Sequence, residues 1–176
     1  MAYGKLIFSK KYQGGSFTRN NAMRFAIDFA VDHHQVNHAD WLQEYYVEPN
    51  NFTVFIDYLR EIVRTNNINL LNATIRYVQA DSQSILTYAK KPSFCIVLYF
   101  DQDLSPSQIK QTKQWTQELI SKAQELGGNY YLPYQQFATK EQFRTGYPGY
   151  TRLLHLKQQY DPTNLFSNNF YENYFK

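Results

Sequence analysis

The side chains best suited to chemistry are three polar residues that alternate along one predicted strand. Over residues 70–78 the apolar residues take one set of alternate positions, while Asn72, Thr74 and Arg76 take the other. An arginine on a sheet face is costly to bury alone, so Arg76 needs a carboxylate, a phosphate or a polar ligand nearby. Two interpretations follow: the three residues bind a substrate, or Arg76 forms a structural ion pair with Glu44 of the first predicted strand.

The last predicted strand, residues 129–135, adds further candidates. Tyr131 and Gln135 share one set of alternate positions, Tyr134 belongs to the other, and the sequence leaves open which set packs into the core. We take Tyr131 and Gln135 as substrate-contacting candidates beside Arg76. A tyrosine in a strand nevertheless packs more often than it reacts.

Three histidines, His33, His34 and His38, could suggest a metal site because the last two are four residues apart. No Glu-x-x-His motif and no cysteine accompanies them, so we interpret them as exposed histidines and predict no metal site. The sequence also shows no Gly-rich phosphate loop, nucleophile elbow or catalytic-triad pattern.

An alternating series of strands and helices must position these residues. The periodicity predicts strands over 41–47, 70–78, 94–100 and 129–135, and helices over 52–65 and 106–126. The order β-α-β-β-α-β is the ferredoxin-like arrangement, in which an antiparallel sheet carries both helices on one face. We therefore predict an α+β fold whose other sheet face is open for binding. Helices over 140–145 and 150–160 form a C-terminal extension.

The domain organisation follows from the same pattern. Residues 1–40 are interpreted as a lead-in segment, with a possible helix over 20–31, and residues 41–176 as the domain itself. A polar turn at Asp81 and a short helix through Leu86 are expected to connect the second and third strands.

Composition narrows the class of protein. The 176 residues are 18% aromatic and carry a net charge of only +3. Because disordered segments have few aromatic residues, this aromatic content excludes the interpretation of the chain as a disordered tail. No apolar run approaches the roughly 20 residues that span a bilayer, no secretion signal is evident, and the single Cys95 excludes an internal disulfide framework. We expect a soluble cytoplasmic protein without a transmembrane segment.

The C-terminal part of the sequence resembles a known protein family. Residues 157–168, Lys-Gln-Gln-Tyr-Asp-Pro-Thr-Asn-Leu-Phe-Ser-Asn, resemble the Lys-x-x-Tyr-Asp-Pro-x-x-x-Phe-x-Asn signature near the end of FAD-linked oxidases of the vanillyl-alcohol-oxidase type. This group includes berberine-bridge-like and sugar-lactone oxidases. Segments 43–49, 72–78 and 127–134 resemble further parts of the same family in the same order, so the resemblance covers about residues 41–175.

The resemblance implies a role and a cofactor. Residues 41–176 would be the cap, or substrate, domain of a flavoenzyme that transfers a hydride from a substrate C–H to FAD. Arg76 would face the substrate or the flavin, and Asn168 and Tyr134 would be cofactor-binding residues. The return segment to the FAD-binding domain would be held by a further set of residues, Lys157, Tyr160, Asp161 and Pro162.

The same resemblance leaves several questions open. The family's FAD-binding domain is expected to be a separate domain or partner chain, so this chain alone should be inactive. Sugar oxidases of the family resemble Ser-Glu-Ile-Arg where this chain has Ala-Thr-Ile-Arg at 73–76, so neither the small-molecule substrate nor the electron acceptor is predicted.

Two alternatives belong to other functional classes. The first is a non-catalytic protein-binding or self-associating module, in which the open sheet face forms a homodimer. The second is an RNA-recognition-like domain, which needs a glycine-containing aromatic motif on its third strand. The corresponding segment, residues 93–100, contains no glycine, so we do not expect nucleic-acid binding.

Overall fold

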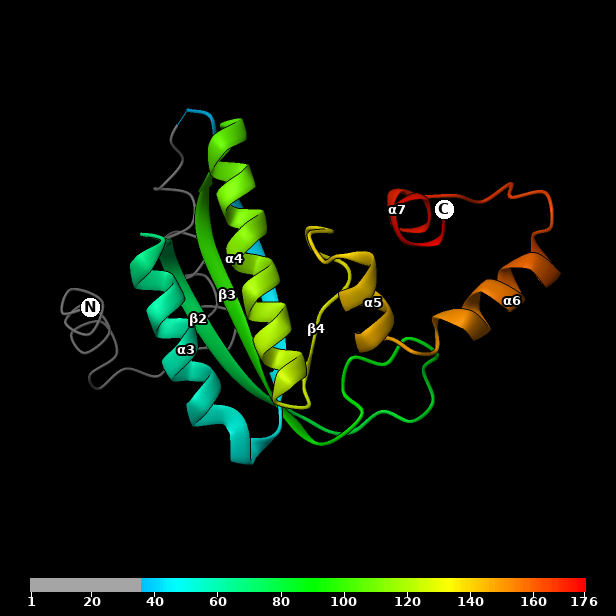
Figure 1. Cartoon of the computed structure of the whole chain (residues 1–176), viewed down its shortest axis with the longest axis horizontal. Helices are drawn as coiled ribbons and strands as arrows, with labels where there is room; N and C mark the ends of the chain where they lie inside the picture. Colours follow the sequence, from blue (N-terminus) through cyan, green and yellow to red (C-terminus); the bar gives the residue numbers. More distant parts are fainter. Residues whose placement is uncertain (1–35) are drawn as a thin grey trace, which may run out of the picture. The chain divides into compact units, whose positions relative to one another are not determined.

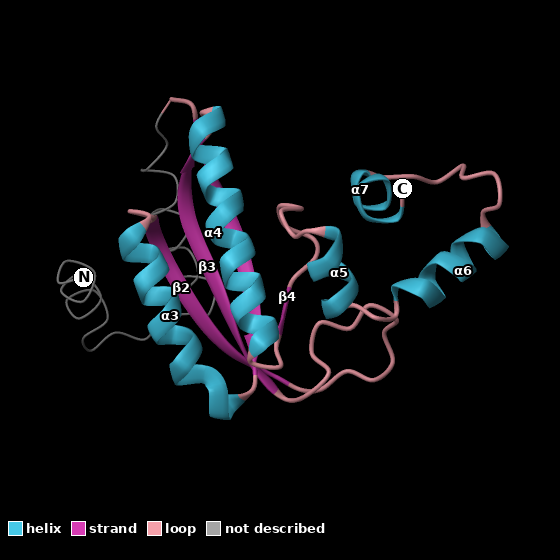
Figure 2. Ribbon diagram, in the orientation of Figure 1, coloured by secondary structure: helices cyan, strands magenta, loops and turns pink. Residues whose placement is uncertain are grey.

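A four-stranded antiparallel sheet organises residues 36–176, the part of the chain that this computed structural model describes (Figures 1 and 2). Its strands are β1 (His38–Val47), β2 (Asn69–Val78), β3 (Ser93–Asp103) and β4 (Asn129–Tyr130). The spatial order β2-β3-β1-β4 places β1 and β3 at the centre and β2 at one edge. This order confirms the predicted ferredoxin-like sheet.

Two long helices cover one face of the sheet, as the sequence predicted (Figure 1). They are α3 (Phe52–Thr65), which follows a short 3-10 turn η1 (Pro49–Asn51), and α4 (Pro106–Glu125). The predicted C-terminal extension is also present as α5 (Lys140–Gly146) and α6 (Tyr150–Tyr160), and a further helix α7 (Asn169–Phe175) follows them. The predicted α+β fold class is confirmed.

The main core lies between this helical layer and the sheet. Side chains of the central strands that point to this face meet the apolar stripes of both helices; the buried set is Tyr45, Val47, Ile96, Leu98 and Phe100 from the strands and Phe55, Leu59, Ile62, Trp115, Leu119, Ile120 and Ala123 from the helices. The rings of Phe100 and Trp115, for example, meet edge to face with centroids 5.2 Å apart. The 3.6-residue periodicity of both helices thus accounts for which face they bury.

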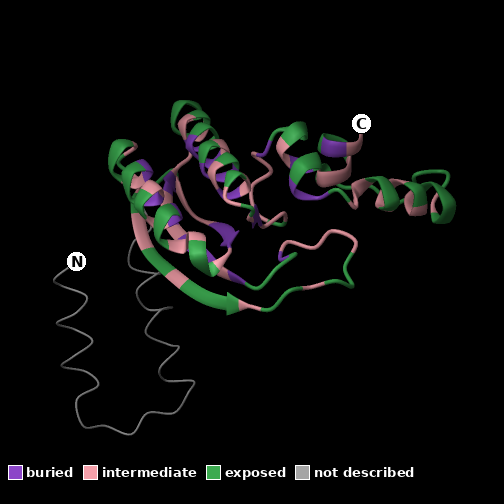
Figure 3. Cartoon of the chain, turned by 60° about the horizontal axis from the view of Figure 1, so that its bottom comes forward, coloured by how far each residue is buried: buried purple, intermediate pink, exposed green. Residues whose placement is uncertain are grey.

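Strand β2 keeps the predicted alternation but lies at the edge. Asn72, Thr74 and Arg76 pair in register with Tyr99, Val97 and Cys95 of β3, so they lie on the face away from the helices. A β-bulge between Leu70 and Asn72 shifts the register, and Leu70 rather than Leu71 therefore packs against the core. Because no described strand covers its outer side, β2 stays largely exposed (Figure 3).

Two predicted elements are wrong. The fourth strand was expected over 129–135, but β4 contains only Asn129 and Tyr130, because the chain turns away before Pro133, which cannot donate a ladder hydrogen bond. The predicted short helix through Leu86 is absent from the described loop at 79–92. The polar turn before it is present, since Asp81 Oδ1 accepts hydrogen bonds from two following backbone amides.

Two glycines close α4 against β1. Gly127 has φ +75°, the left-handed conformation that ends helices, and Gly128 lies so close to the sheet that a Cβ there would be 1.9 Å from the Tyr46 carbonyl oxygen.

The described unit begins at Asn37, and the predicted lead-in helix with His33 and His34 lies outside the described residues. Within the described part, no helix is both long and apolar enough to cross a bilayer.

Candidate functional site

The sheet face opposite α3 and α4 carries most of the polar residues that the sequence marks as candidates. We call it the polar face; its members from β1, β2 and β3 are Asp40, Leu42, Glu44 and Tyr46, then Asn72, Thr74 and Arg76, then Cys95, Val97, Tyr99 and Asp101. Their side chains share this face because paired residues of antiparallel strands point the same way. The register of three strands therefore assembles the site.

The carboxyl group of Glu44 is the centre of this face. Its Oε1 atom accepts hydrogen bonds from the Tyr46 hydroxyl at 2.5 Å and from the Cys95 thiol at 2.7 Å. Its Oε2 atom lies 3.4 Å from the Tyr134 hydroxyl. Glu44 is 8% exposed, so its carboxyl group has lost most of its contact with water. The hydrogen-bond donors around it take the place of that water.

Glu44 also controls the acidity of its neighbours. Burial, followed by the hydrogen bond to Glu44, raises the pKa of the Cys95 thiol to about 12. Burial and then the same carboxyl group raise the pKa of the Tyr46 hydroxyl well above its usual range. Both groups therefore stay protonated at neutral pH and act as hydrogen-bond donors rather than as nucleophiles.

A row of four tyrosines borders Glu44, and we call it the tyrosine row: Tyr46, Tyr88, Tyr131 and Tyr134. Tyr88 stacks on Tyr46 with ring centroids 4.6 Å apart, and successive rings along the row follow at 5.5 Å and 5.2 Å. Tyr88 comes from the 79–92 loop, where Ala89 also packs against Tyr46 and Cys95. This loop covers part of the polar face and supplies an aromatic ring to it.

Arg76 lies at the exposed edge of the same face. It pairs in register with Cys95. Burial is the largest cause of the raised pKa of Cys95 and of Tyr134, and the positive charge of Arg76 lowers both pKa values by a smaller amount. Among the described residues Arg76 forms no ion pair, so the structural pair with Glu44 is not present. The exposed guanidinium remains available to an anionic or polar ligand.

The last predicted strand contributes differently than expected. Tyr131 and Tyr134 both lie in the tyrosine row, although the predicted alternation placed them on opposite faces. Gln135 instead accepts a hydrogen bond at 3.3 Å from Gln43, whose position in β1 points to the helical face. The physical reason is the early end of β4, after which side chains no longer alternate. Gln135 is therefore not brought together with Arg76.

A second polar cluster occupies the far end of the polar face. His38 Nδ1 lies 2.9 Å from Asp101 Oδ2, to which Asn69 donates at 3.1 Å, and the Tyr99 hydroxyl donates to Asp40 at 2.5 Å. His38, which was expected to be exposed, is in fact partly buried beside Asp101. No group of three or more metal-ligating side chains occurs among residues 36–176.

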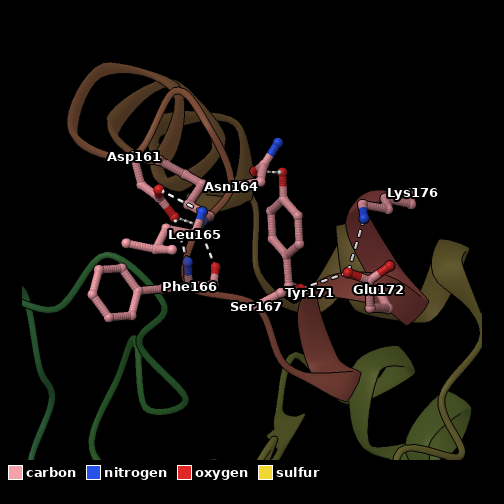
Figure 4. A network of polar contacts seen from close by, with 9 residues as sticks. Asp161, Asn164, Leu165, Phe166, Ser167, Tyr171, Glu172 and Lys176 are labelled. Carbon is pink, nitrogen blue, oxygen red and sulfur yellow. Dashed lines mark hydrogen bonds and ion pairs between the residues drawn. The ribbon is translucent and has the colours of Figure 1, made fainter.

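The segment that resembles the oxidase signature forms a closed turn (Figure 4). Asp161 follows α6 and accepts hydrogen bonds from the Leu165 amide at 2.8 Å, from the Phe166 amide at 3.0 Å, and from Lys157. Asn164 closes the turn with φ +52°, a left-handed conformation that asparagine tolerates. We call residues 157–166 the Asp161 turn. These contacts show how Lys157 and Asp161 hold the turn together.

The apolar residues of this segment point outward. Tyr160, Leu165 and Phe166 are 77%, 78% and 76% exposed, whereas Lys157 and Asp161 have mostly buried side chains. The resemblance implied that Tyr160 and Pro162 help to hold the segment, but the contacts within the described residues come from Lys157 and Asp161.

Asn168 has a structural contact of its own. Its Oδ1 atom caps α7 by accepting a hydrogen bond from the Tyr171 amide at 2.9 Å. It also lines a shallow pocket with Leu132 and Pro133, the neighbours of Tyr134 in sequence. The structure therefore places Asn168 beside the loop that carries Tyr134 but not on the polar face.

Comparison with known proteins agrees with the C-terminal part of this description. Residues 141–170 match the family described as "Berberine and berberine like", and this stretch contains the Asp161 turn. No curated protein matches the chain. The match indicates a C-terminal region of the FAD-linked oxidase type.

Sequence reasoning missed several members of the site, among them the three that contact Glu44 or each other around it: Tyr46, Tyr88 and Cys95. The parity of β1 could have identified Tyr46, because it is two residues from Glu44 and must share its face. Cys95 lay in an apolar run without alternation, and Tyr88 lies in a loop, so neither carried a comparable signal.

Proposed function

We propose that residues 37–176 form the substrate-side part of a FAD-linked oxidoreductase, with the polar face and the tyrosine row directed at the flavin and the substrate. The observation that carries this proposal is the match of residues 141–170 to the berberine-like family. FAD would be bound mainly by a part of the enzyme other than residues 37–176. The chemistry that bound FAD would supply is the acceptance of a hydride from a substrate C–H bond.

The chemistry of the polar face supports such a role. A flat heteroaromatic ring that gains negative charge on reduction is suited to stacking on aromatic side chains and to a nearby cation. Three rings of the tyrosine row are partly exposed, those of Tyr88, Tyr131 and Tyr134. Arg76 offers an exposed cation without an ion-pair partner among the described residues. Residues 37–176 would therefore contact the ring and the substrate and leave the rest of FAD to the other part.

Within this role each group has a distinct task. Arg76 would hold negative charge on the substrate or on the reduced ring, and Asn72 and Thr74 would hydrogen-bond to the substrate beside it. Glu44 would position the Tyr134 hydroxyl, while Tyr131 would provide an apolar wall.

The carboxyl groups of this face disfavour the RNA-binding alternative, because they would repel phosphates.

Titration with FMN, used as a probe for the flavin ring, tests the proposal. In ¹⁵N NMR spectra of the full chain, we expect weak binding that shifts the amide signals of Thr74, Arg76 and Tyr131 and leaves those of α3 and α4 unchanged. Inorganic phosphate serves as the matched control, because it carries the anionic group without the ring. Signals that shift only in α3 and α4, equal shifts with phosphate alone, or no shift at any FMN concentration would contradict it.

A further inference from the structure

The outer edge of β2 is the most exposed strand edge that the structure describes. β2 is ten residues long and pairs with β3 alone among the described strands. Ile75 and Tyr77 on its helical side are 52% and 56% exposed, and Asn72 and Arg76 on its other side are also exposed. The strand contains no proline and no lysine, the residues that commonly protect an edge from pairing with another strand.

We propose that two copies of this chain associate by antiparallel pairing of their β2 strands. The two-fold axis would pass through Thr74, so that Thr74 lies opposite Thr74 of the second copy. This register follows from the side chains. A two-fold axis perpendicular to the sheet keeps the polar face of both copies on the same side, so only positions of equal parity can pair.

The pairs that this register creates are complementary on both faces. On the polar face, Thr74 meets itself in a favourable Thr–Thr pair, and Asn72 meets Arg76, whose guanidinium can donate to the amide oxygen. On the helical face, the small Ala73 meets the larger Ile75. Each side chain from position 72 to position 76 thus obtains a compatible partner from an identical copy.

Electrostatics favour the same register. The only charged residue of β2 is Arg76, and in this register the two arginines are four positions apart along the strands. At a rise of about 3.3 Å per residue this separation is roughly 13 Å. That distance exceeds the screening length of about 8 Å at physiological ionic strength. A two-fold axis through Arg76 itself would instead place like charges directly opposite each other.

Sedimentation equilibrium of the full chain over a range of concentrations tests the association. We expect the mass to rise from 20.9 kDa toward twice that value. Thr74→Asp should weaken association by about tenfold or more, because it places two carboxylates opposite each other. Thr151→Asp on the exposed surface of α6 is the matched control and should leave association unchanged. A mass that stays at 20.9 kDa, or a dimer that Thr74→Asp does not weaken, would overturn the proposal.

Cross-linking tests the register independently. In the proposed pair, Thr74→Cys brings two thiols within the distance that a disulfide requires, and oxidised glutathione should link the copies covalently. Tyr77→Cys is the control, because the two introduced thiols would lie six positions, or about 20 Å, apart. Cys95 does not interfere, since it is fully buried. Cross-linking through residue 77 instead of residue 74 would contradict this register.

Discussion

Glu44 and Cys95 meet across the two central strands, with the cysteine thiol 2.7 Å from Oε1 of the glutamate. The same oxygen accepts the Tyr46 hydroxyl at 2.5 Å, so one buried acceptor holds donors from both strands. This contact links β1 to β3 on the polar face, away from the main core. It therefore has consequences for stability as well as for chemistry.

The first prediction concerns the stability of this contact. Glu44→Gln keeps the shape of the side chain but replaces one acceptor oxygen with a donor, which leaves buried donors without a full acceptor. We expect a loss of about 1–2 kcal/mol in the free energy of unfolding, measured by urea denaturation. Glu61→Gln on the exposed side of α3 is the control and should change it little. Equal stability of the two variants would show that Glu44 does not hold the strands together.

The second prediction concerns the reactivity and pH dependence of Cys95. Its pKa of about 12 means that the folded protein keeps the thiol protonated where an unfolded chain ionises. Because the folded pKa is raised, the stability from this group is full below the unfolded pKa of about 9 and is lost as pH rises toward 12.

Thiol labelling measures this effect directly. Iodoacetamide should modify Cys95 slowly at pH 8 in the folded protein and rapidly in denaturant. Glu44→Gln should accelerate labelling of the folded protein, because it removes a cause of the raised pKa. Rapid labelling of the folded wild-type chain would show that the thiol is neither buried nor held by Glu44.

The elements that sequence reasoning predicted well are those with a strong local period. The alternation at 70–78 correctly placed Asn72, Thr74 and Arg76 on one face, because the period of a strand is a property of neighbouring residues. The edge position of β2 depends on the order of all four strands, which no local pattern contains. The same limit concealed the contact between Glu44 and Cys95, since it requires the register of β1 against β3.

The fourth strand shows where local reasoning failed. The aromatic run after Gly128 favours a strand, but tertiary structure ends it at Tyr130, and Tyr131 and Tyr134 then share a face that alternation would forbid. Pro133 could have predicted this early end of the strand, because proline is rare inside a paired strand. The resemblance of residues 157–168, by contrast, singled out a segment that the structure shows as one hydrogen-bonded turn.

The third prediction concerns this turn. Contact with Lys157, followed by the backbone amides, holds the pKa of Asp161 below its usual range. Because the folded pKa is lowered, the contribution of Asp161 is present above the unfolded pKa of about 3.9 and is lost as pH falls through the folded value. We therefore expect the Asp161 turn to survive mild acid.

Hydrogen exchange separates the turn from the rest of the chain. Asp161→Ala should increase exchange of the Leu165 and Phe166 amides, both of which donate to Asp161, while β3 keeps its protection. Asp57→Ala on the exposed surface of α3 is the control, since among the described residues its side chain pairs only with Arg60. Unchanged exchange in the Asp161→Ala variant would mean that the turn is held by other contacts.

The fourth prediction concerns the charge of Arg76 and rests on the proposed function. If the polar face meets a flavin ring, the chain should bind reduced, anionic FMN more tightly than oxidised FMN, because the guanidinium favours negative charge on the ring. An exposed charge contact contributes about 0.2–1 kcal/mol, so the preference should be at most about fivefold. Arg76→Gln should remove the preference, Arg76→Lys should retain part of it, and Arg152→Gln on exposed α6 should leave it unchanged. Anaerobic NMR titrations with both redox forms measure the ratio, and an undiminished preference in Arg76→Gln would exclude Arg76 from the flavin-facing role.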